Sequence, residues 1–242
     1  MNKLWIFGDS YSTYNRERGN NPLSIYTNLC DELNFEQNNM AISGLSNSDI
    51  FTNLIKFLID YKKGDTIIFQ LSFLDRFSYI NLRENKILND HEKMLCSFSD
   101  KYFIHPQYYH SDDKSNLTET QFKAFNIFLE NNFYNLFDSY YKFFNQLKHI
   151  INFLEKNQIN FKLIILEDKD MDYNGSSINL LHLLRELKLD RYILPIGDRL
   201  TIKKCKFYME QETTYEYHHF SLEVIDKIGE EIKKSFVNEF KI

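Results

Sequence analysis

The chain has 242 residues, of which 43% are apolar, and it carries a formal net charge of −5. This length and composition predict one domain, spanning residues 1 to 242, with a single substantial core. The acidic balance and the lack of long basic runs argue against nucleic acid as a partner. No apolar stretch reaches the roughly 18 residues that cross a membrane, or the length of a signal peptide. We therefore expect a soluble, cytoplasmic protein.

Short apolar runs bounded by turn residues predict the buried strands of a parallel sheet. Strands are expected at residues 4 to 7, 35 to 41, 66 to 72, 162 to 168 and 191 to 197. Apolar residues at helical spacing predict helices at residues 22 to 33, 48 to 61 and 221 to 240. Because strands and helices alternate, the expected fold class is α/β with a doubly wound sheet.

The interval from about 77 to 160 is too long for a simple crossover and is expected to be an insertion. Its first half is polar and loop-like, whereas apolar and mostly aromatic residues recur at helical spacing from Thr120 to Gln158. A long helix, or two, that packs this aromatic stripe into the core is the preferred interpretation. A cap over the active site or an oligomer surface is the alternative, and the oligomeric state is left open.

The three cysteines, Cys30, Cys96 and Cys205, are widely spaced. There is no Cys-x-x-Cys pair, and no histidine stands beside any of them. An odd and dispersed set suits neither a disulfide framework nor a metal site, so we expect reduced core thiols.

The segment FGDSYS, residues 7 to 12, follows the first predicted strand and places Ser10 just beyond its end. Proteins with open α/β sheets bind ligands at the carboxyl edge of the sheet, so Ser10 is a candidate nucleophile. A serine hydroxyl needs a base to take its proton, and ideally an acid to orient that base. Asp9 is expected to brace the loop through hydrogen bonds rather than to act on a substrate.

The stretch TTYEYHHF, just before the C-terminal helix, supplies candidates for the base and the acid. His218 and His219 stand in a loop that feeds the sheet edge, whereas the other histidines fall in the polar insertion or inside helical patterns. His219 is the candidate base. Glu216, three residues earlier, is placed to hold the far nitrogen of that imidazole.

A third loop lies in NNMAISGLSNSDI, residues 38 to 50, where Gly44 precedes a predicted helix. A glycine there leaves a backbone N–H exposed and lets a ligand approach closely, as an oxyanion site requires. Three loops are therefore expected to meet at one edge of the sheet.

These segments resemble the SGNH, or GDSL-type, hydrolases, a family named after blocks around Ser, Gly, Asn and His. FGDSYS resembles the first block, NMAISGLSNSDI the second and EYHHFSLEVIDKIG the last, so the resemblance covers both ends and the first third of the chain. It implies a three-layer, flavodoxin-like α/β/α fold and ester hydrolysis without a cofactor or metal. It also implies a triad of Ser10, His219 and Glu216, although the family usually has Asp at the last position. The N–H groups of Ser10 and Gly44 would bind the oxyanion.

The third block departs from the family pattern, Gly-x-Asn-Asp. Aligning the acid on Asp75 in IIFQLSFLDRF puts Leu74 at the Asn position. Losing an Asn that donates to the oxyanion would cost roughly a hundredfold or more in rate unless another group replaces it. Gln70 and Ser72 are the candidate replacements. Arg76 would bind an anionic part of the substrate, unless it only pairs with an acid at the surface.

The leading hypothesis is a serine esterase that removes a small acyl group such as acetyl, and family analogy suggests a carbohydrate ester as the substrate. Acyl transfer to a sugar hydroxyl through the same acyl-enzyme is one alternative. A degenerate member that binds a glycan or protein without catalysis is another, because the Asn is missing. A flavodoxin-like nucleotide-binding domain is disfavoured because FGDSYS lacks the Gly-rich loop that phosphates need.

Overall fold

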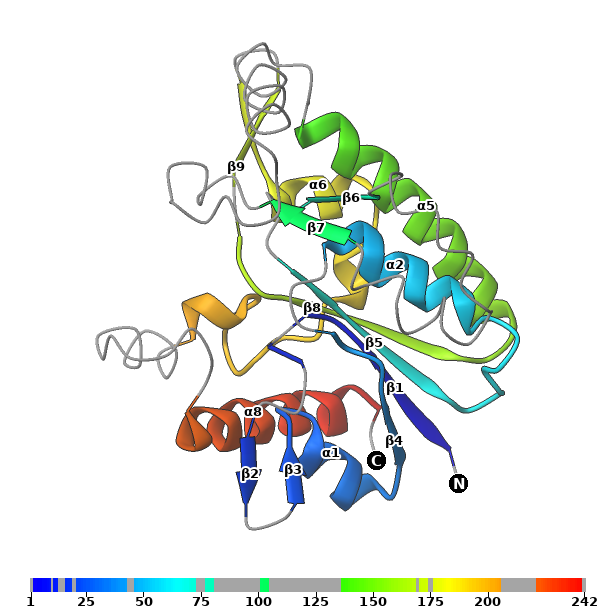
Figure 1. The fold of residues 1–242 in the computed structure, drawn as a ribbon, viewed down its shortest axis with the longest axis vertical. Helices are drawn as coiled ribbons and strands as arrows, with labels where there is room; N and C mark the ends of the chain where they lie inside the picture. The colour runs from blue at the N-terminus through cyan, green and yellow to red at the C-terminus, as the bar shows by residue number, and fades with distance from the viewer. Residues whose placement is uncertain are drawn as a thin grey trace.

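A sheet of four parallel strands forms the centre of the computed structural model (Figure 1). The structure describes residues 2–9, 11–12, 16–18, 21–42, 46–72, 77–80, 101–104, 136–168, 170–173, 176–205 and 221–240. The strands lie in the order β4 (Glu36–Asn39), β1 (Lys3–Phe7), β5 (Thr66–Leu71) and β8 (Asn160–Ile165). The predicted parallel sheet is confirmed, and β8 begins and ends slightly earlier than its predicted range.

The chain winds in both directions from its first strand. After β1 it forms β4 on one side of β1, and it then crosses to β5 and β8 on the other side. This strand order is compatible with a flavodoxin-like fold. The direction of winding changes between β1 and β5, and ligands of such sheets bind outside the carboxyl ends of the strands at that point.

Helices cover both faces of the sheet (Figure 1). On one face lie α2 (Asn47–Lys56) and α5 (Leu136–Lys156), and α6 (Leu180–Glu186) contributes to the same apolar cluster. On the other face lie α1 (Thr27–Leu33) and α8 (Leu222–Phe240). Among the helices in the described ranges, none is both long enough and apolar enough to cross a membrane.

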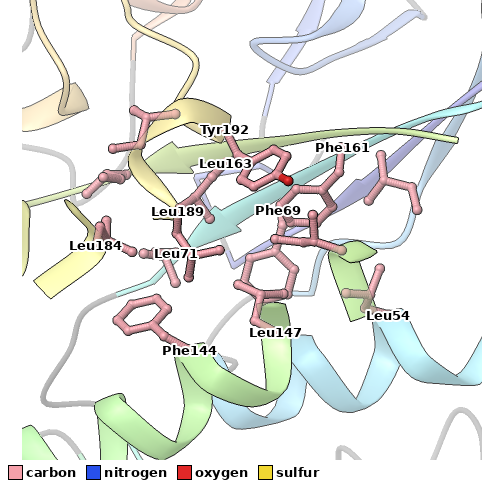
Figure 2. Close-up of a cluster of buried hydrophobic side chains, with 14 of the residues drawn as sticks. Leu54, Phe69, Leu71, Phe144, Leu147, Phe161, Leu163, Leu184, Leu189 and Tyr192 are labelled. Carbon is pink, nitrogen blue, oxygen red and sulfur yellow. The ribbon is translucent and has the colours of Figure 1, made fainter. Parts of the chain in front are cut away.

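The aromatic stripe predicted after residue 120 packs into the core where the structure describes it. Its buried members on α5 are Tyr140, Phe144, Leu147, Ile151 and Leu154. Figure 2 shows Phe144 and Leu147 pointing from α5 toward the sheet, where Phe69 and Leu71 of β5 lie. Core packing is therefore confirmed for α5, which forms the crossover between β5 and β8. Residues 81–100 and 105–135 of the predicted insertion lie outside the described residues.

Three antiparallel hairpins within the described ranges were not predicted. They pair β2 (Arg16–Arg18) with β3 (Asn21–Leu23), β6 (Phe77–Ile80) with β7 (Lys101–Ile104), and β9 (Asp170–Tyr173) with β10 (Ser176–Asn179). Because β3 occupies residues 21–23, the helix predicted from residue 22 begins only at Thr27. The helix predicted to residue 61 ends at Lys56.

The strand predicted at residues 191 to 197 is wrong. The chain there forms a short 3₁₀ turn, η2 (Asp190–Tyr192), and its backbone pairs with β8 through isolated bridges at Ile193 and Thr201 instead of a continuous ladder. Pro195 has no N–H to donate to a ladder. Gly197 has a φ of 63°, which turns the chain back on itself before η3 (Ile202–Lys204).

The two cysteines that the structure describes, Cys30 and Cys205, are buried free thiols, as predicted. Burial, together with the charge of Asp31, raises the pKa of the Cys30 thiol to about 12, and burial raises the pKa of the Cys205 thiol to about 11. From an ordinary value of 9.0, this lowers the thiolate fraction at neutral pH roughly a thousandfold and a hundredfold. Neither thiol should be alkylated by iodoacetamide in the native protein, and both should react in urea, as peptide mass spectrometry would show. Rapid native labelling of either would contradict this burial.

Candidate functional site

The carboxyl ends of β1 and β5 lie side by side and carry a cluster of buried polar groups. In the register of the two strands Phe7 is opposite Phe69, so the residues that follow β1 lie beside the end of β5. Asp9, just after β1, is fully buried, and Ser72, just after β5, is 1% exposed. The cluster therefore occupies the point where the winding of the sheet changes direction.

Three donors among the described residues hydrogen-bond to the Asp9 carboxylate. Its Oδ1 accepts from the Tyr11 N–H (3.0 Å) and from Gln70 Nε2 (3.1 Å), and its Oδ2 accepts from the Ser72 hydroxyl (2.6 Å). The Asp9 carbonyl also accepts from the Ser12 N–H (3.0 Å), a bond that spans position 10. Asp9 therefore braces the loop after β1, as expected from the sequence.

Gln70 connects Asp9 to two hydroxyl groups on the far side of its amide. Gln70 Oε1 accepts hydrogen bonds from the Ser12 hydroxyl and from the Tyr26 hydroxyl (3.2 Å). Burial raises the pKa of Tyr26 well above its ordinary range, and the nearby charge of Asp9 adds to this against the Ser12 hydrogen bond. The phenol therefore stays protonated and acts as a donor, which fixes the orientation of the Gln70 amide.

Asn47, at the start of α2, ties the end of β5 to two helices. Its Oδ1 accepts from the Ser72 N–H (2.7 Å), and its Nδ2 donates to the Ser72 carbonyl (3.2 Å) and to the Tyr140 hydroxyl on α5 (2.8 Å). Asn47 is 2% exposed. The α2 N-terminus is fixed further by Ser46, whose hydroxyl caps the Asp49 N–H (3.3 Å).

We call these connected residues the Asp9 network. Its members are Asp9, Ser12, Tyr26, Asn47, Gln70, Ser72 and Tyr140, all of them buried. Within the described residues the connections run from Tyr26, just before α1, through the ends of β1 and β5 to α2 and α5.

The loop after β4 and the backbone of Gly8 complete the packing around this network. Asn39 Nδ2 donates to the Ser12 carbonyl (2.8 Å), and the Ile42 N–H donates to the Gly8 carbonyl (3.1 Å). A Cβ on Gly8 would lie 2.5 Å from Ser12 Oγ and 3.1 Å from Gln70 Cβ. Glycine is therefore required here by close approach.

Five of the predicted site residues lie outside the described residues, namely Ser10, Gly44, Arg76, Glu216 and His219. Gln70 and Ser72, the predicted substitutes for the missing Asn, are described. The single hydroxyl proton of Ser72 and one N–H of Gln70 are directed at Asp9. An oxyanion role for these two side chains stays a prediction, and it would require the Ser72 bond to be exchanged.

Sequence reasoning missed four members of the network: Ser12, Tyr26, Asn47 and Tyr140. Ser12 stands inside the first block, two residues after Ser10, and its repeated serine pattern was the available signal. Tyr26, just before α1, and Tyr140, on α5, stand in patterns whose periodicity indicates only apolar faces. No local pattern marks them as polar partners.

A second polar cluster lies at the same edge, beyond β8. Glu167 and Asp168 pair with Lys203 (2.9 Å) and Lys204 (2.9 Å). Among the described residues, Glu167 Oε1 and Asp168 Oδ1 are buried without a hydrogen-bond partner. These two acceptors would therefore suit donors that the described part of the chain does not supply.

Comparison of the chain with protein-family models found no match, and a search of curated proteins found no significant relative. In the described part of the chain, no group of three or more His, Cys, Asp or Glu side chains is arranged to hold a metal ion. The resemblance to SGNH hydrolases therefore rests on the three sequence segments alone.

Proposed function

We propose that this protein is a serine hydrolase of the SGNH type that cleaves a small acyl ester through an acyl-enzyme. Ser10 is the nucleophile, His219 the general base and Glu216 the acid that orients the imidazole. The proposed substrate is an acetyl ester of a carbohydrate, a choice that rests on family analogy.

The observation that carries the proposal is the fixation of the chain on both sides of position 10. Asp9 and Tyr11 are joined by a hydrogen bond, Asp9 and Ser12 by another, and both bonds span that position. They lie at the carboxyl ends of β1 and β5, where open α/β sheets bind their ligands. A tightly held loop at this point suits a nucleophile whose hydroxyl must keep a fixed direction.

The proposed reaction proceeds in two steps. Ser10 Oγ attacks the acyl carbonyl carbon while His219 takes the hydroxyl proton, and the N–H groups of Ser10 and Gly44 stabilise the oxyanion. The ester C–O bond then breaks, and His219 returns the proton to the leaving alcohol. Water, deprotonated by His219, attacks the acyl carbon, the bond from that carbon to Ser10 Oγ breaks, and His219 returns the proton to Ser10 as the carboxylic acid leaves. Arg76 would bind an anionic part of the substrate.

Leu74, at the position of the family Asn, favours a second candidate function, a non-catalytic protein that binds the same ligand class. Acyl transfer to another hydroxyl is a variant of the catalytic proposal, because it differs only in which nucleophile attacks the acyl-enzyme.

The proposal is tested by hydrolysis of a chromogenic acetyl ester and by labelling with a fluorophosphonate, each compared between the native protein and Ser10→Ala. We expect turnover and labelling in the native protein only, with the label on the peptide that contains Ser10. If the folded native protein shows neither, the hydrolase proposal is wrong and the binding candidate takes its place. Turnover that rises when a sugar alcohol is added, with formation of its ester, would identify acyl transfer.

A further inference from the structure

We propose that Gln70, with Tyr26 and Ser12 behind it, is a positioning residue that fixes the Ser10 loop through Asp9. This inference rests on the proposed serine hydrolase function. It assigns Gln70 a role different from donating to the oxyanion, since the hydrogen bonds of its amide face Asp9 on one side and two hydroxyls on the other.

The chemistry of the site selects an amide at position 70. One end of the side chain must donate to a buried carboxylate, and the other end must accept from the Tyr26 and Ser12 hydroxyls. A carboxylate at this position would meet Asp9 acceptor to acceptor, and an apolar side chain would remove one donor from Asp9 and the acceptor that the Ser12 and Tyr26 hydroxyls share. Gln70 is itself fully buried, so water is poorly placed to substitute.

The hydrogen bonds of Gln70 connect the loop after β1 to the tightly packed helix layer on one face of the sheet. Tyr26 belongs to the apolar cluster of the α1 and α8 face, where it is fully buried. Its hydroxyl also lies 3.2 Å from Ser12 Oγ, so Tyr26, Ser12 and Gln70 form a closed triangle of polar contacts. Removing one corner should leave the fold intact but loosen the loop that the triangle holds.

Such positioning has more weight here than in a site with a full set of oxyanion donors. With Leu74 in place of Asn, the proposed oxyanion site depends on the backbone N–H groups of Ser10 and Gly44. Backbone donors cannot adjust by changing rotamer, so their alignment follows the placement of their loops. Misplacement by about 1 Å can cost on the order of a hundredfold in rate.

Tyr26→Phe tests the positioning role of Gln70 and its partners, and Tyr61→Phe is the matched control. Each removes one buried phenol that makes a hydrogen bond, to Gln70 (3.2 Å) in the first and to the Leu54 carbonyl (2.8 Å) in the second. Both variants should lose similar, small amounts of stability in urea. Tyr26→Phe should lower kcat for the acetyl ester about tenfold with KM nearly unchanged, whereas Tyr61→Phe should keep the native kcat. Equal kcat values in the two variants would overturn the positioning role.

Gln70→Glu supplies a second test, the pH dependence of kcat, which should not change if Gln70 has only a structural role. The new carboxyl is of the same size and faces Asp9, so the two groups bind a shared proton more tightly than either alone. The paired, protonated form predominates at low pH and is lost as the pH rises. The ratio of variant to native kcat should therefore fall as pH rises between about 5.5 and 8.5. Because His219 titrates in both proteins, its effect on kcat divides out of this ratio.

A pH-independent ratio in a folded Gln70→Glu protein would overturn the inference even where Tyr26→Phe is slow. Failure of this inference is distinguishable from failure of the proposed function. In the first case native Ser10 is labelled by the fluorophosphonate and the variants match it in kcat. In the second case native Ser10 is not labelled at all.

Discussion

Ser10→Ala and His219→Ala are each expected to lower kcat for ester hydrolysis by on the order of 10⁵-fold or more, with the double variant no slower than either single one. The two side chains act as a unit in the proposed mechanism, because a serine without its base and a base without its serine are equally ineffective. Steady-state kinetics with the acetyl ester, corrected for the uncatalysed rate, would measure the three values. Losses that multiply in the double variant would show that the two residues act independently.

His218 provides a control for His219 at the neighbouring position. His218→Ala should keep kcat within about threefold of the native value, because only His219 stands three residues after Glu216 in the acid-x-x-His pattern. Glu216→Gln should fall between the two, with a loss of up to about 10⁴-fold, because an amide favours the wrong imidazole tautomer. Inactivation by His218→Ala with an active His219→Ala would exchange the roles of the two histidines.

The central sheet was predictable because its strands are buried on both faces. Runs such as Leu4 to Phe7 and Thr66 to Leu71 are continuous in sequence and are fully or nearly fully buried in the structure. The positions of β1, β5 and β8 could therefore be predicted from continuous apolar runs in the sequence. β4, with the sequence EQNN, is at the edge of the described sheet and consists of partly or fully exposed polar residues, so no continuous apolar run marks it in the sequence.

The hairpins were harder to predict because each is a separate two-stranded sheet of strands only three or four residues long, too short to show a clear hydrophobic period. A signal was present for β9 and β10, since the dipeptide Asn174–Gly175 between them is typical of a two-residue hairpin turn. At Ile193 the error was the opposite one, because a strand was predicted where the structure has none. Its apolar residues are buried as a strand's would be, but Pro195 and Gly197 prevent a continuous ladder.

The Asp9 network shows why only part of the candidate site could be predicted from the sequence. Asp9 and Ser72 were visible as polar residues at strand ends, and parallel topology brings such ends together. The network extends from them to residues distant in sequence and on helices, since Ser72 bonds to Asn47 of α2 and Asn47 bonds to Tyr140 of α5, 93 positions further along the chain. A helical pattern reports which face is buried and does not report which buried hydroxyl meets which amide. That information exists only after the layers are packed.

Asp9→Ala is expected to destabilise the fold more than any other single change in the network. It removes the acceptor to which the Tyr11 N–H, the Gln70 amide and the Ser72 hydroxyl donate, at a position that is fully buried. At 1 to 3 kcal/mol for each orphaned group, and with partial relaxation, we expect a loss of about 4 kcal/mol in the free energy of unfolding, measured in urea. Asp9→Asn should lose about half as much, because its amide oxygen still accepts and the Ser72 hydroxyl can turn to accept from its nitrogen.

Asp65 separates the effect on stability from the effect on the site. It too is a buried carboxylate with three donors, the N–H groups of Lys3 (2.9 Å) and Lys62 (3.0 Å) and the indole of Trp5 (3.1 Å). It stands before β5, at the opposite edge of the sheet from Asp9. Asp65→Ala should therefore cost a comparable free energy while the molecules that remain folded label at Ser10 at the native rate. In Asp9→Ala the labelling rate per folded molecule should fall at least tenfold, because the loop has lost the side-chain acceptor that spans position 10, and in Asp9→Asn, which keeps one oxygen acceptor, it should fall less. Equal labelling rates in the Asp9 and Asp65 variants would show that Asp9 stabilises the fold but does not position Ser10.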